Sequence, residues 1–131
     1  FYKSLKNGED YTDENGVIIK NDLLTLPAPK GKVYAFCADT RYDERILPHI
    51  KEADMIYHET TYHDVLADTA FERFHSTTRQ AGKIAKLAGV KKLLIGHFSS
   101  KYDTLIEFET ETREIFPNTD LALEGVSYLF P

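Results

Sequence analysis

The apolar positions of this chain fall into short runs that alternate with longer amphipathic segments. Four runs have the length of a β-strand, at residues 33–38, 55–58, 92–96 and 121–123. Four segments have helical spacing, at residues 44–51, 65–74, 77–87 and 104–115. Strands that alternate with helices are typical of an α/β domain built on a parallel sheet. We therefore predict an α/β fold for residues 33–131.

The third helical segment carries the clearest boundary signals. Thr77 is followed three residues later by Gln80, the spacing of a capping box, and Ser76 is an alternative N-cap. Gly89 fits the end of the helix. The apolar positions of one face are Ala81, Ile84, Ala85 and Ala88. This face is predicted to pack on the sheet.

Residues 1–32 have a different pattern of apolar and turn-forming residues. Turn signals such as Asn7-Gly8 and Asn15-Gly16 flank a single apolar run at Val17-Ile18-Ile19, and the segment Pro27-Ala28-Pro29 follows. We predict a peripheral hairpin and a linker here, and a separate domain at 33–131.

Composition bounds the class of protein. A chain of 131 residues with 42% apolar residues has the size and core of one globular domain. No run approaches the roughly 18–20 apolar residues that cross a bilayer, and no secretion signal opens the sequence. The single cysteine, Cys37, has no partner for an internal disulfide. We expect a cytoplasmic protein with no membrane partner.

Charge is distributed unevenly along the chain. The formal net charge is −5, with 16 basic and 21 acidic residues. Seven of the basic residues and none of the acidic ones lie in residues 73–102, which leaves 9 basic and 21 acidic residues elsewhere. The basic segment is either a solvated helix face or a surface for RNA. We interpret it as the place where RNA lies.

Polar side chains follow three of the predicted strands. Asp39 comes after the first, His58-Glu59 ends the second, and His97 comes after the third. The carboxyl ends of parallel strands meet at one edge of a sheet, where ligands bind in open α/β folds. Carboxylates and imidazoles are ligands for zinc, although Asp39 taken alone is explained by a helix cap. His75, ahead of a helix, is either a general acid or a residue without a catalytic task.

The ordered motifs Cys37-Ala38-Asp39-Thr40, His58-Glu59-Thr60-Thr61-Tyr62, His75-Ser76-Thr77 and Gly96-His97-Phe98-Ser99-Ser100-Lys101-Tyr102 carry a resemblance. In order and spacing the chain resembles the ribonuclease Z family, tRNA 3′-processing endonucleases of the metallo-β-lactamase superfamily. The opening eight residues resemble the stretch after the tRNA-binding arm of bacterial members. The family's His-x-His-x-Asp-His motif has no counterpart in these 131 residues, so the resemblance is to the C-terminal part.

The resemblance implies a fold and an activity. The fold is the C-terminal half of a four-layer αβ/βα sandwich. The activity is zinc-dependent endonucleolytic removal of the 3′ trailer from precursor tRNA, which leaves a 3′-hydroxyl on the tRNA. Family members carry two Zn²⁺ ions per active site and are commonly homodimers. We expect the 131 residues alone to be inactive.

The resemblance also implies roles for single residues. Asp39 would bridge the two zinc ions and His97 would hold one of them. His75 would protonate the leaving oxygen, with Glu59 orienting its ring. The substrate phosphates would be contacted by Ser99, Ser100, Lys101 and Thr40. Lys101 stands where the family usually has arginine, which replaces a bidentate contact with a point charge.

Two alternatives stay open from the sequence. One is another hydrolase of the metallo-β-lactamase superfamily. The other is a receiver-like phosphoacceptor domain, in which Asp39 would carry the phosphoryl group and Asn21-Asp22 would stand in place of the acidic pair after an early strand.

Overall fold

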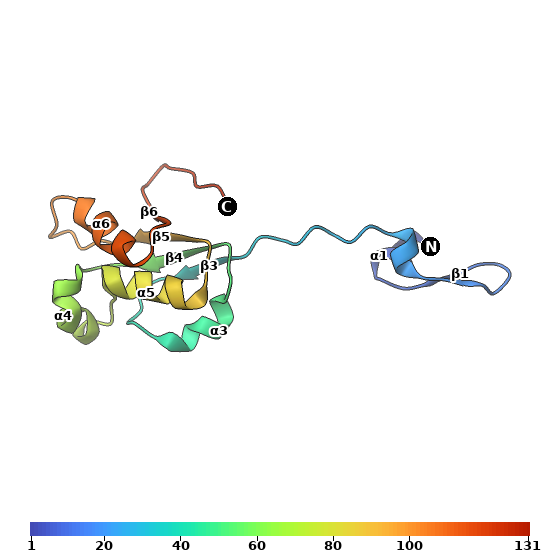
Figure 1. The fold of residues 1–131 in the computed structure, drawn as a ribbon, viewed down its shortest axis with the longest axis horizontal. Helices are drawn as coiled ribbons and strands as arrows, with labels where there is room; N and C mark the ends of the chain where they lie inside the picture. Colours follow the sequence, from blue (N-terminus) through green and yellow to red (C-terminus); the bar gives the residue numbers. More distant parts are fainter. The chain divides into compact units, whose positions relative to one another are not determined.

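The computed structural model describes all 131 residues, which form two compact units, Phe1–Gly31 and Lys32–Pro131. The boundary lies one residue from the predicted one. Figure 1 shows the elements of each unit along the chain.

The first unit is built around a short hairpin. It contains α1 (Tyr2–Lys6), β1 (Tyr11–Thr12), β2 (Ile18–Ile19) and α2 (Asn21–Leu24). Tyr11 pairs antiparallel with Ile19, and the Asp13 carboxylate accepts the backbone N–H groups of Asn15 and Val17 inside the turn. The predicted hairpin is therefore present, and residues 25–31 after it have no helix or strand.

The second unit contains a parallel sheet of four strands. They are β3 (Tyr34–Cys37), β4 (Met55–Glu59), β5 (Lys92–Gly96) and β6 (Thr119–Leu121), in the spatial order β3-β4-β5-β6. In the register, Cys37 lies opposite His58 and Glu59 lies opposite Gly96. The first three strands agree with prediction to within one residue at each end. The strand order contradicts the receiver-like alternative, because flavodoxin-like sheets have the order 2-1-3-4-5.

The fourth strand begins two residues before the predicted run. Thr119 and Asp120 are polar and give no apolar signal, yet they pair with Leu93 and Leu94 through the backbone. The buried Thr119 hydroxyl donates to the Phe116 carbonyl at 2.6 Å, which satisfies its polarity. The start of this edge strand depends on backbone pairing and on a hydroxyl group that is hydrogen-bonded. The hydropathy of its residues does not indicate it.

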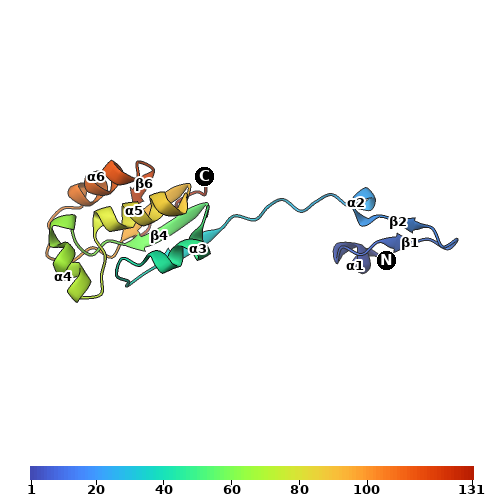
Figure 2. The same ribbon diagram turned by 60° about the horizontal axis from the view of Figure 1, so that its bottom comes forward.

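Helical segments connect the strands. They are η1 (Glu44–Ile46), α3 (Leu47–Ile50), η2 (Asp64–Leu66), α4 (Ala67–Glu72), α5 (Thr78–Ala88) and α6 (Ile106–Ile115). The two predicted helices at 44–51 and 65–74 are each a 3-10 turn followed by a short α-helix. In Figure 2, α5 lies along the strands.

The ends and packing of α5 follow from its sequence. Thr77 is the N-cap and forms the complete capping box with Gln80, and Gly89 ends the helix with φ of 64°. Gly82 allows a close approach to α6, because a Cβ at this position would lie 2.9 Å from the Cβ of Ile115. The capping prediction is confirmed, with Thr77 rather than Ser76 as the cap.

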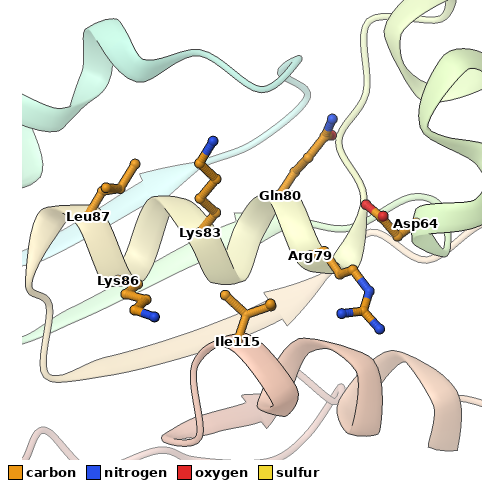
Figure 3. A pocket seen from close by; sticks show the side chains of 7 residues that line it. All are labelled: Asp64, Arg79, Gln80, Lys83, Lys86, Leu87 and Ile115. Carbon is orange, nitrogen blue, oxygen red and sulfur yellow. The ribbon is translucent and has the colours of Figure 1, made fainter.

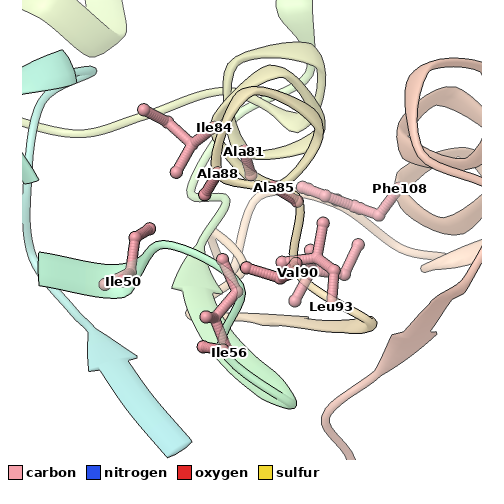
Figure 4. Close-up of a cluster of buried hydrophobic side chains, with 11 residues drawn as sticks. Ile50, Ile56, Ala81, Ile84, Ala85, Ala88, Val90, Leu93 and Phe108 are labelled. Atoms are coloured by element: carbon pink, nitrogen blue, oxygen red, sulfur yellow. The ribbon is translucent and has the colours of Figure 1, made fainter. Parts of the chain in front are cut away.

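The core lies between one face of the sheet and the helices. Figure 4 shows Ile84 and its neighbours on α5 against Ile56 and Leu93 of the sheet, with Phe108 of α6 beside them. The four predicted apolar positions of α5 are all at most 2% exposed. On the opposite face of β3, Tyr34 and Phe36 are 47% and 66% exposed. The sheet therefore buries the face toward α5, and its other face exposes apolar surface at the edge strand β3, whereas Met55 and Leu94 on that face are 3% and 6% exposed.

The helices of this chain are too short or too polar to cross a membrane.

Candidate metal centre

Four side chains meet at the carboxyl edge of the sheet. Asp39 follows β3, Glu59 ends β4, His97 follows β5, and His75 lies between α4 and α5. One potential ligand atom from each lies within 4.8 Å of the others. The predicted convergence of the strand-end residues is thus present, and the structure adds His75 to it.

His58 is separated from this group by the alternation of the strand. It is fully buried, and its Nδ1 lies 2.8 Å from the Glu59 carbonyl. Burial lowers the pKa of His58, which favours the neutral ring. Its Nε2 has no hydrogen-bond partner. His58 belongs to the buried interior and takes no part in the cluster.

The Glu59 carboxylate is buried and fully engaged in hydrogen bonds. Its side chain has no exposed surface. Oε1 lies 2.8 Å from His75 Nδ1, and Oε2 accepts the backbone N–H of Thr61 at 2.9 Å and the Thr61 hydroxyl at 2.8 Å. With both oxygens occupied, Glu59 is suited to hold other groups in position rather than to bind a cation itself.

The hydrogen-bond network around Glu59 assigns the tautomers of both histidines. The single hydroxyl proton of Thr61 goes to the carboxylate, so the Thr61 oxygen accepts from His97 Nδ1, which is 2.8 Å away. His75 donates its own Nδ1–H to Glu59 directly. In the neutral form, each ring then has an unprotonated Nε2. Glu59 therefore orients His75 directly and His97 through Thr61.

Asp39 and His97 form the accessible side of the cluster. His97 Nε2 lies 3.0 Å from Asp39 Oδ1, and their side chains are 44% and 67% exposed. Two acceptor atoms face each other here, so they require a cation between them, either a proton on Nε2 or a metal ion. Two ligands of a tetrahedral zinc ion lie about 3.3 Å apart, which is close to the observed separation. The pair fits a metal ion, and other ligands are needed to complete a four-coordinate site.

The backbone at these two residues is strained. Asp39 has φ of 45° and His97 has φ of 60°, in the left-handed region that non-glycine residues rarely occupy. Gly96 precedes His97 where a Cβ would lie 2.6 Å from the Tyr57 hydroxyl. Strain of this kind concentrates at functional sites.

Backbone and hydroxyl contacts tie the loops of the cluster together. Thr60 N–H donates to the Gly96 carbonyl at 2.8 Å, and Ser99 N–H donates to the Thr61 carbonyl at 3.0 Å. The Ser76 hydroxyl donates to the Thr40 carbonyl at 2.6 Å. Each loop that carries a cluster residue is thus linked to its neighbour.

The predicted phosphate contacts have different surroundings. Ser100 and Lys101 are exposed, and Ser99 is partly buried. The Lys101 ammonium lies over the rings of Tyr62 and Tyr102 at 5.4 and 5.1 Å. The Thr40 hydroxyl donates to the Arg41 carbonyl at 2.8 Å, so its proton is already used. No contact with a phosphate is tested by this geometry, and the four residues stay predictions.

The basic segment at residues 73–102 does not form one continuous positive surface. Four of its seven cations pair with carboxylates from other parts of the chain: Arg79 with Glu111 and Glu114, Lys83 with Glu44, Lys91 with Asp54, and Lys92 with Asp120. These pairs offset part of the positive charge, and the interpretation of residues 73–102 as the place where RNA lies stays a prediction. The Lys101 ammonium lies over the ring of Tyr62 and Arg73 donates to its hydroxyl at 3.2 Å, and this ring lies 6.3 Å from that of His75, centroid to centroid.

A pocket on the outer side of α5 is separate from the cluster. Its volume is about 500 Å³. Figure 3 shows Arg79 and Lys86 of α5 beside Ile115 of α6, with Lys83 on the same helix. None of the four cluster residues lines it. The candidate site is therefore the carboxyl edge of the sheet and not this pocket.

Sequence reasoning missed the role of Thr61. Thr61 lies within the motif His58-Glu59-Thr60-Thr61-Tyr62, and the structure places it between Glu59 and His97. A hydroxyl two residues after a buried carboxylate was the available signal, but the contact with His97 spans 36 residues and required the fold.

No protein-family model matches the chain. Ribonuclease Z from Parabacteroides distasonis is 43% identical over 124 residues, covering 95% of this chain and 41% of that protein. Ribonuclease Z from Phocaeicola vulgatus is 45% identical over 120 residues, covering 92% of this chain and 39% of that protein. The chain is homologous to ribonuclease Z. It spans about 40% of the length of these curated relatives.

Solved structures agree with this relationship. The metallo-β-lactamase fold protein YhfI from Bacillus subtilis matches with a TM-score of 0.61 and 26% identity, over 70% of this chain and 37% of that one. The short form of human tRNase Z matches with a TM-score of 0.52 and 30% identity, over 65% and 27%. A long-form RNase Z from yeast has a TM-score of 0.59 at 22% identity, over 68% and 12%, which supports the fold alone. The predicted metallo-β-lactamase fold and the predicted similarity to ribonuclease Z are confirmed.

Proposed function

We propose that this chain supplies part of the active site of a zinc-dependent endoribonuclease that removes the 3′ trailer from precursor tRNA. The observation that carries the proposal is the cluster of Asp39, Glu59, His75 and His97 at the sheet edge. Homology to ribonuclease Z over 95% of the chain supports tRNA as the substrate class. The short form of human tRNase Z, at 30% identity, supports the same class.

Asp39 and His97 are the residues that would hold zinc. They are accessible, they face each other, and carboxylate and imidazole are ordinary zinc ligands. A bound pair of zinc ions would supply Lewis-acid stabilisation and a nucleophile at neutral pH. Asp39 would bridge the pair and His97 would hold one ion. Further ligands would come from outside these 131 residues.

His75 would deliver a proton to the leaving oxygen of the RNA. Its Nδ1 is held by the Glu59 carboxylate at 2.8 Å, and its side chain is 24% exposed. The carboxylate accepts the Nδ1–H bond in both protonation states of the ring, so the orientation is retained while Nε2 gains and loses a proton. A positioned imidazole of this kind contributes about 10²–10⁴-fold to a rate.

The path of the RNA backbone would run past the loop after β5. Ser99, Ser100 and Lys101 follow His97 after Phe98, and Lys101 is exposed. Arg73 adds a second cation beside Tyr62, whose ring centroid lies 6.3 Å from that of His75. These positive groups support binding of phosphates close to the cluster.

We also propose that a second layer covers the open face of the sheet in the complete protein. Phe36 stacks on Tyr57 with ring centroids 4.6 Å apart, and Phe36 is 66% exposed. An exposed aromatic face of this kind fits a partner sheet, as the four-layer sandwich requires. Homodimer formation remains a prediction from the resemblance to the family, and a cytoplasmic location remains a prediction from the single cysteine and the composition.

The proposed function is tested with the complete gene product and a precursor tRNA labelled at its 5′ end. The expected result is one cut after the mature 3′ end, with a 3′-hydroxyl on the tRNA and a 5′-phosphate on the trailer. Chelation should stop the reaction, and added zinc should restore it. A chromogenic β-lactam is the comparison substrate. Hydrolysis of the β-lactam without cleavage of the tRNA would overturn the proposal in favour of another superfamily hydrolase.

A further inference from the structure

Two phenylalanine rings and a guanidinium group form a stack next to the cluster. The Arg41 guanidinium carbon lies 4.2 Å from the ring centroid of Phe71 and 3.8 Å from that of Phe74. Arg41 Nε also donates to the Phe71 carbonyl at 2.6 Å. We name Phe71, Arg41 and Phe74 the Arg41 stack. It joins the loop after β3 to the end of α4.

The Arg41 stack adjoins the cluster on both sides. Arg41 lies two residues after Asp39, and Phe74 directly precedes His75. Consecutive Cα atoms are about 3.8 Å apart, so each end of the stack is one or two such steps from a cluster residue. The Ser76 hydroxyl bond to the Thr40 carbonyl closes the two loops against each other.

The aromatic rings of the stack are exposed to an unusual degree for their size. Phe71 and Phe74 are 62% and 63% exposed, and neither belongs to the hydrophobic core. Large aromatic side chains in this position do not stabilise the interior. Beside a cluster with a proposed role in RNA cleavage, they are suited to contact a ligand.

The backbone at Phe74 favours another residue. Phe74 has φ of 62°, and His75 N–H donates to the Ala70 carbonyl at 2.8 Å, which is the hydrogen bond that ends a helix. Glycine is the usual residue at such a position, because it has no Cβ to strain. The hydrogen bond that ends the helix therefore does not explain why this position has an exposed phenylalanine instead of glycine.

Arg41 retains donors that the protein does not use. It takes part in none of the ion pairs, and Nε is its one nitrogen with a hydrogen-bond acceptor. The two terminal nitrogens of the guanidinium are therefore available to a phosphate oxygen, for which their planar arrangement is suited.

We propose that the Arg41 stack binds one nucleotide next to the scissile phosphate, with its base stacked on Phe74 and its phosphate on Arg41. The inference rests on the proposed RNA-cleaving function. Stacking of a base on an aromatic ring tolerates any base sequence, because every base has a π face. Such a contact would fix the register of the substrate without demanding one sequence.

The test compares Phe74→Gly with the wild type in the complete gene product. Glycine fits the φ of this residue, so the variant is expected to fold and to be at least as stable. Loss of one base–aromatic stack weakens binding by about 5- to 150-fold, so KM for precursor tRNA should rise by such a factor while kcat changes little. Phe74→Trp keeps an aromatic ring and should bind precursor tRNA as the wild type does. Arg41→Lys keeps the charge but loses the planar guanidinium group, so it should bind more weakly than the wild type.

An abasic scan of the substrate identifies the nucleotide. Removing one base near the cut should weaken wild-type binding, and the same removal should have no effect on Phe74→Gly. A KM within twofold of the wild type, or an abasic penalty that persists in Phe74→Gly, would overturn the inference while leaving the proposed function standing. Absence of any tRNA cleavage by the wild type would instead refute the proposed function. Direct binding of a single-stranded RNA to both proteins would then decide on the stack separately.

Discussion

The two carboxylates of the cluster occupy opposite surroundings although they flank the same two histidines. Glu59 has no exposed surface and accepts hydrogen bonds at both oxygens. Asp39 is 67% exposed and faces His97 Nε2 at 3.0 Å. Burial with saturated acceptors makes a carboxylate a positioning group, and exposure with free oxygens makes it a ligand. Two carboxylates at the same edge of the sheet can therefore be suited to different roles, which their residue types alone do not distinguish.

The sharpest contrast is expected when the exposed carboxylate is lost. Asp39→Ala in the complete gene product removes a proposed bridging ligand, so zinc content should fall and tRNA cleavage should drop below detection. Metal analysis together with the cleavage assay checks both. Retention of full zinc content would show that Asp39 is not a ligand.

Loss of the proton donor should leave the metal in place. His75→Ala is expected to keep its zinc and to lose about 10²–10⁴-fold in the rate of cleavage. His49→Ala is the matched control, because His49 is exposed on α3 and takes no part in the cluster. A His75→Ala enzyme that cleaves at the wild-type rate would refute the proton-donor role.

Thr61 forms hydrogen bonds with both Glu59 and His97. A substitution of Thr61 therefore tests whether Glu59 positions His97. Thr61→Val keeps the shape and removes the hydroxyl that contacts Glu59 and His97. Outer groups that orient a metal ligand are worth about 10- to 100-fold in metal affinity, and we expect a loss of this size in zinc binding. Thr61→Ser keeps the hydroxyl and should stay close to the wild type. Equal affinities of the two variants would mean that His97 is oriented by other contacts.

A carboxylate far from the cluster should affect stability alone. Asp54 accepts from Lys91 at 2.7 Å and from the Val33 N–H, which hold its pKa below the ordinary 3.8. Its stabilising effect is complete above pH 3.8 and is lost as the pH falls through the lower folded-state pKa. The free energy of unfolding of Asp54→Asn should therefore be below that of the wild type at about pH 5 and approach it at about pH 3. Urea titrations at both values measure it, and a difference that does not shrink in acid would refute this assignment.

Local signals predicted part of the molecule well. The capping box of Thr77 and Gln80 and the stop at Gly89 predicted α5 from neighbouring residues. The strand ends brought Asp39, Glu59 and His97 together because a parallel sheet aligns them. Motif order predicted the similarity to ribonuclease Z.

Contacts between residues that are distant in the sequence could not be predicted from such local signals. The carboxylates that pair with the basic segment lie outside it in the chain, both before it at Glu44 and after it at Asp120, so the ion pairs required the fold. The resemblance implied separate roles for Glu59 and Asp39, but the burial of Glu59 and its contact with Thr61, which support them, are not encoded in the spacing of residues. The start of β6 depends on backbone pairing with β5.

The most direct test of the two roles is a zinc titration of Glu59→Gln and Asp39→Asn in the complete gene product. If Glu59 only positions the histidines, Glu59→Gln reaches the wild-type number of bound zinc ions at saturation, with affinity about 10- to 100-fold weaker. Asp39→Asn replaces the carboxylate with a weaker amide ligand. It is expected to bind fewer zinc ions than the wild type at every zinc concentration of the titration. Loss of stoichiometry in Glu59→Gln with full stoichiometry in Asp39→Asn would contradict the account.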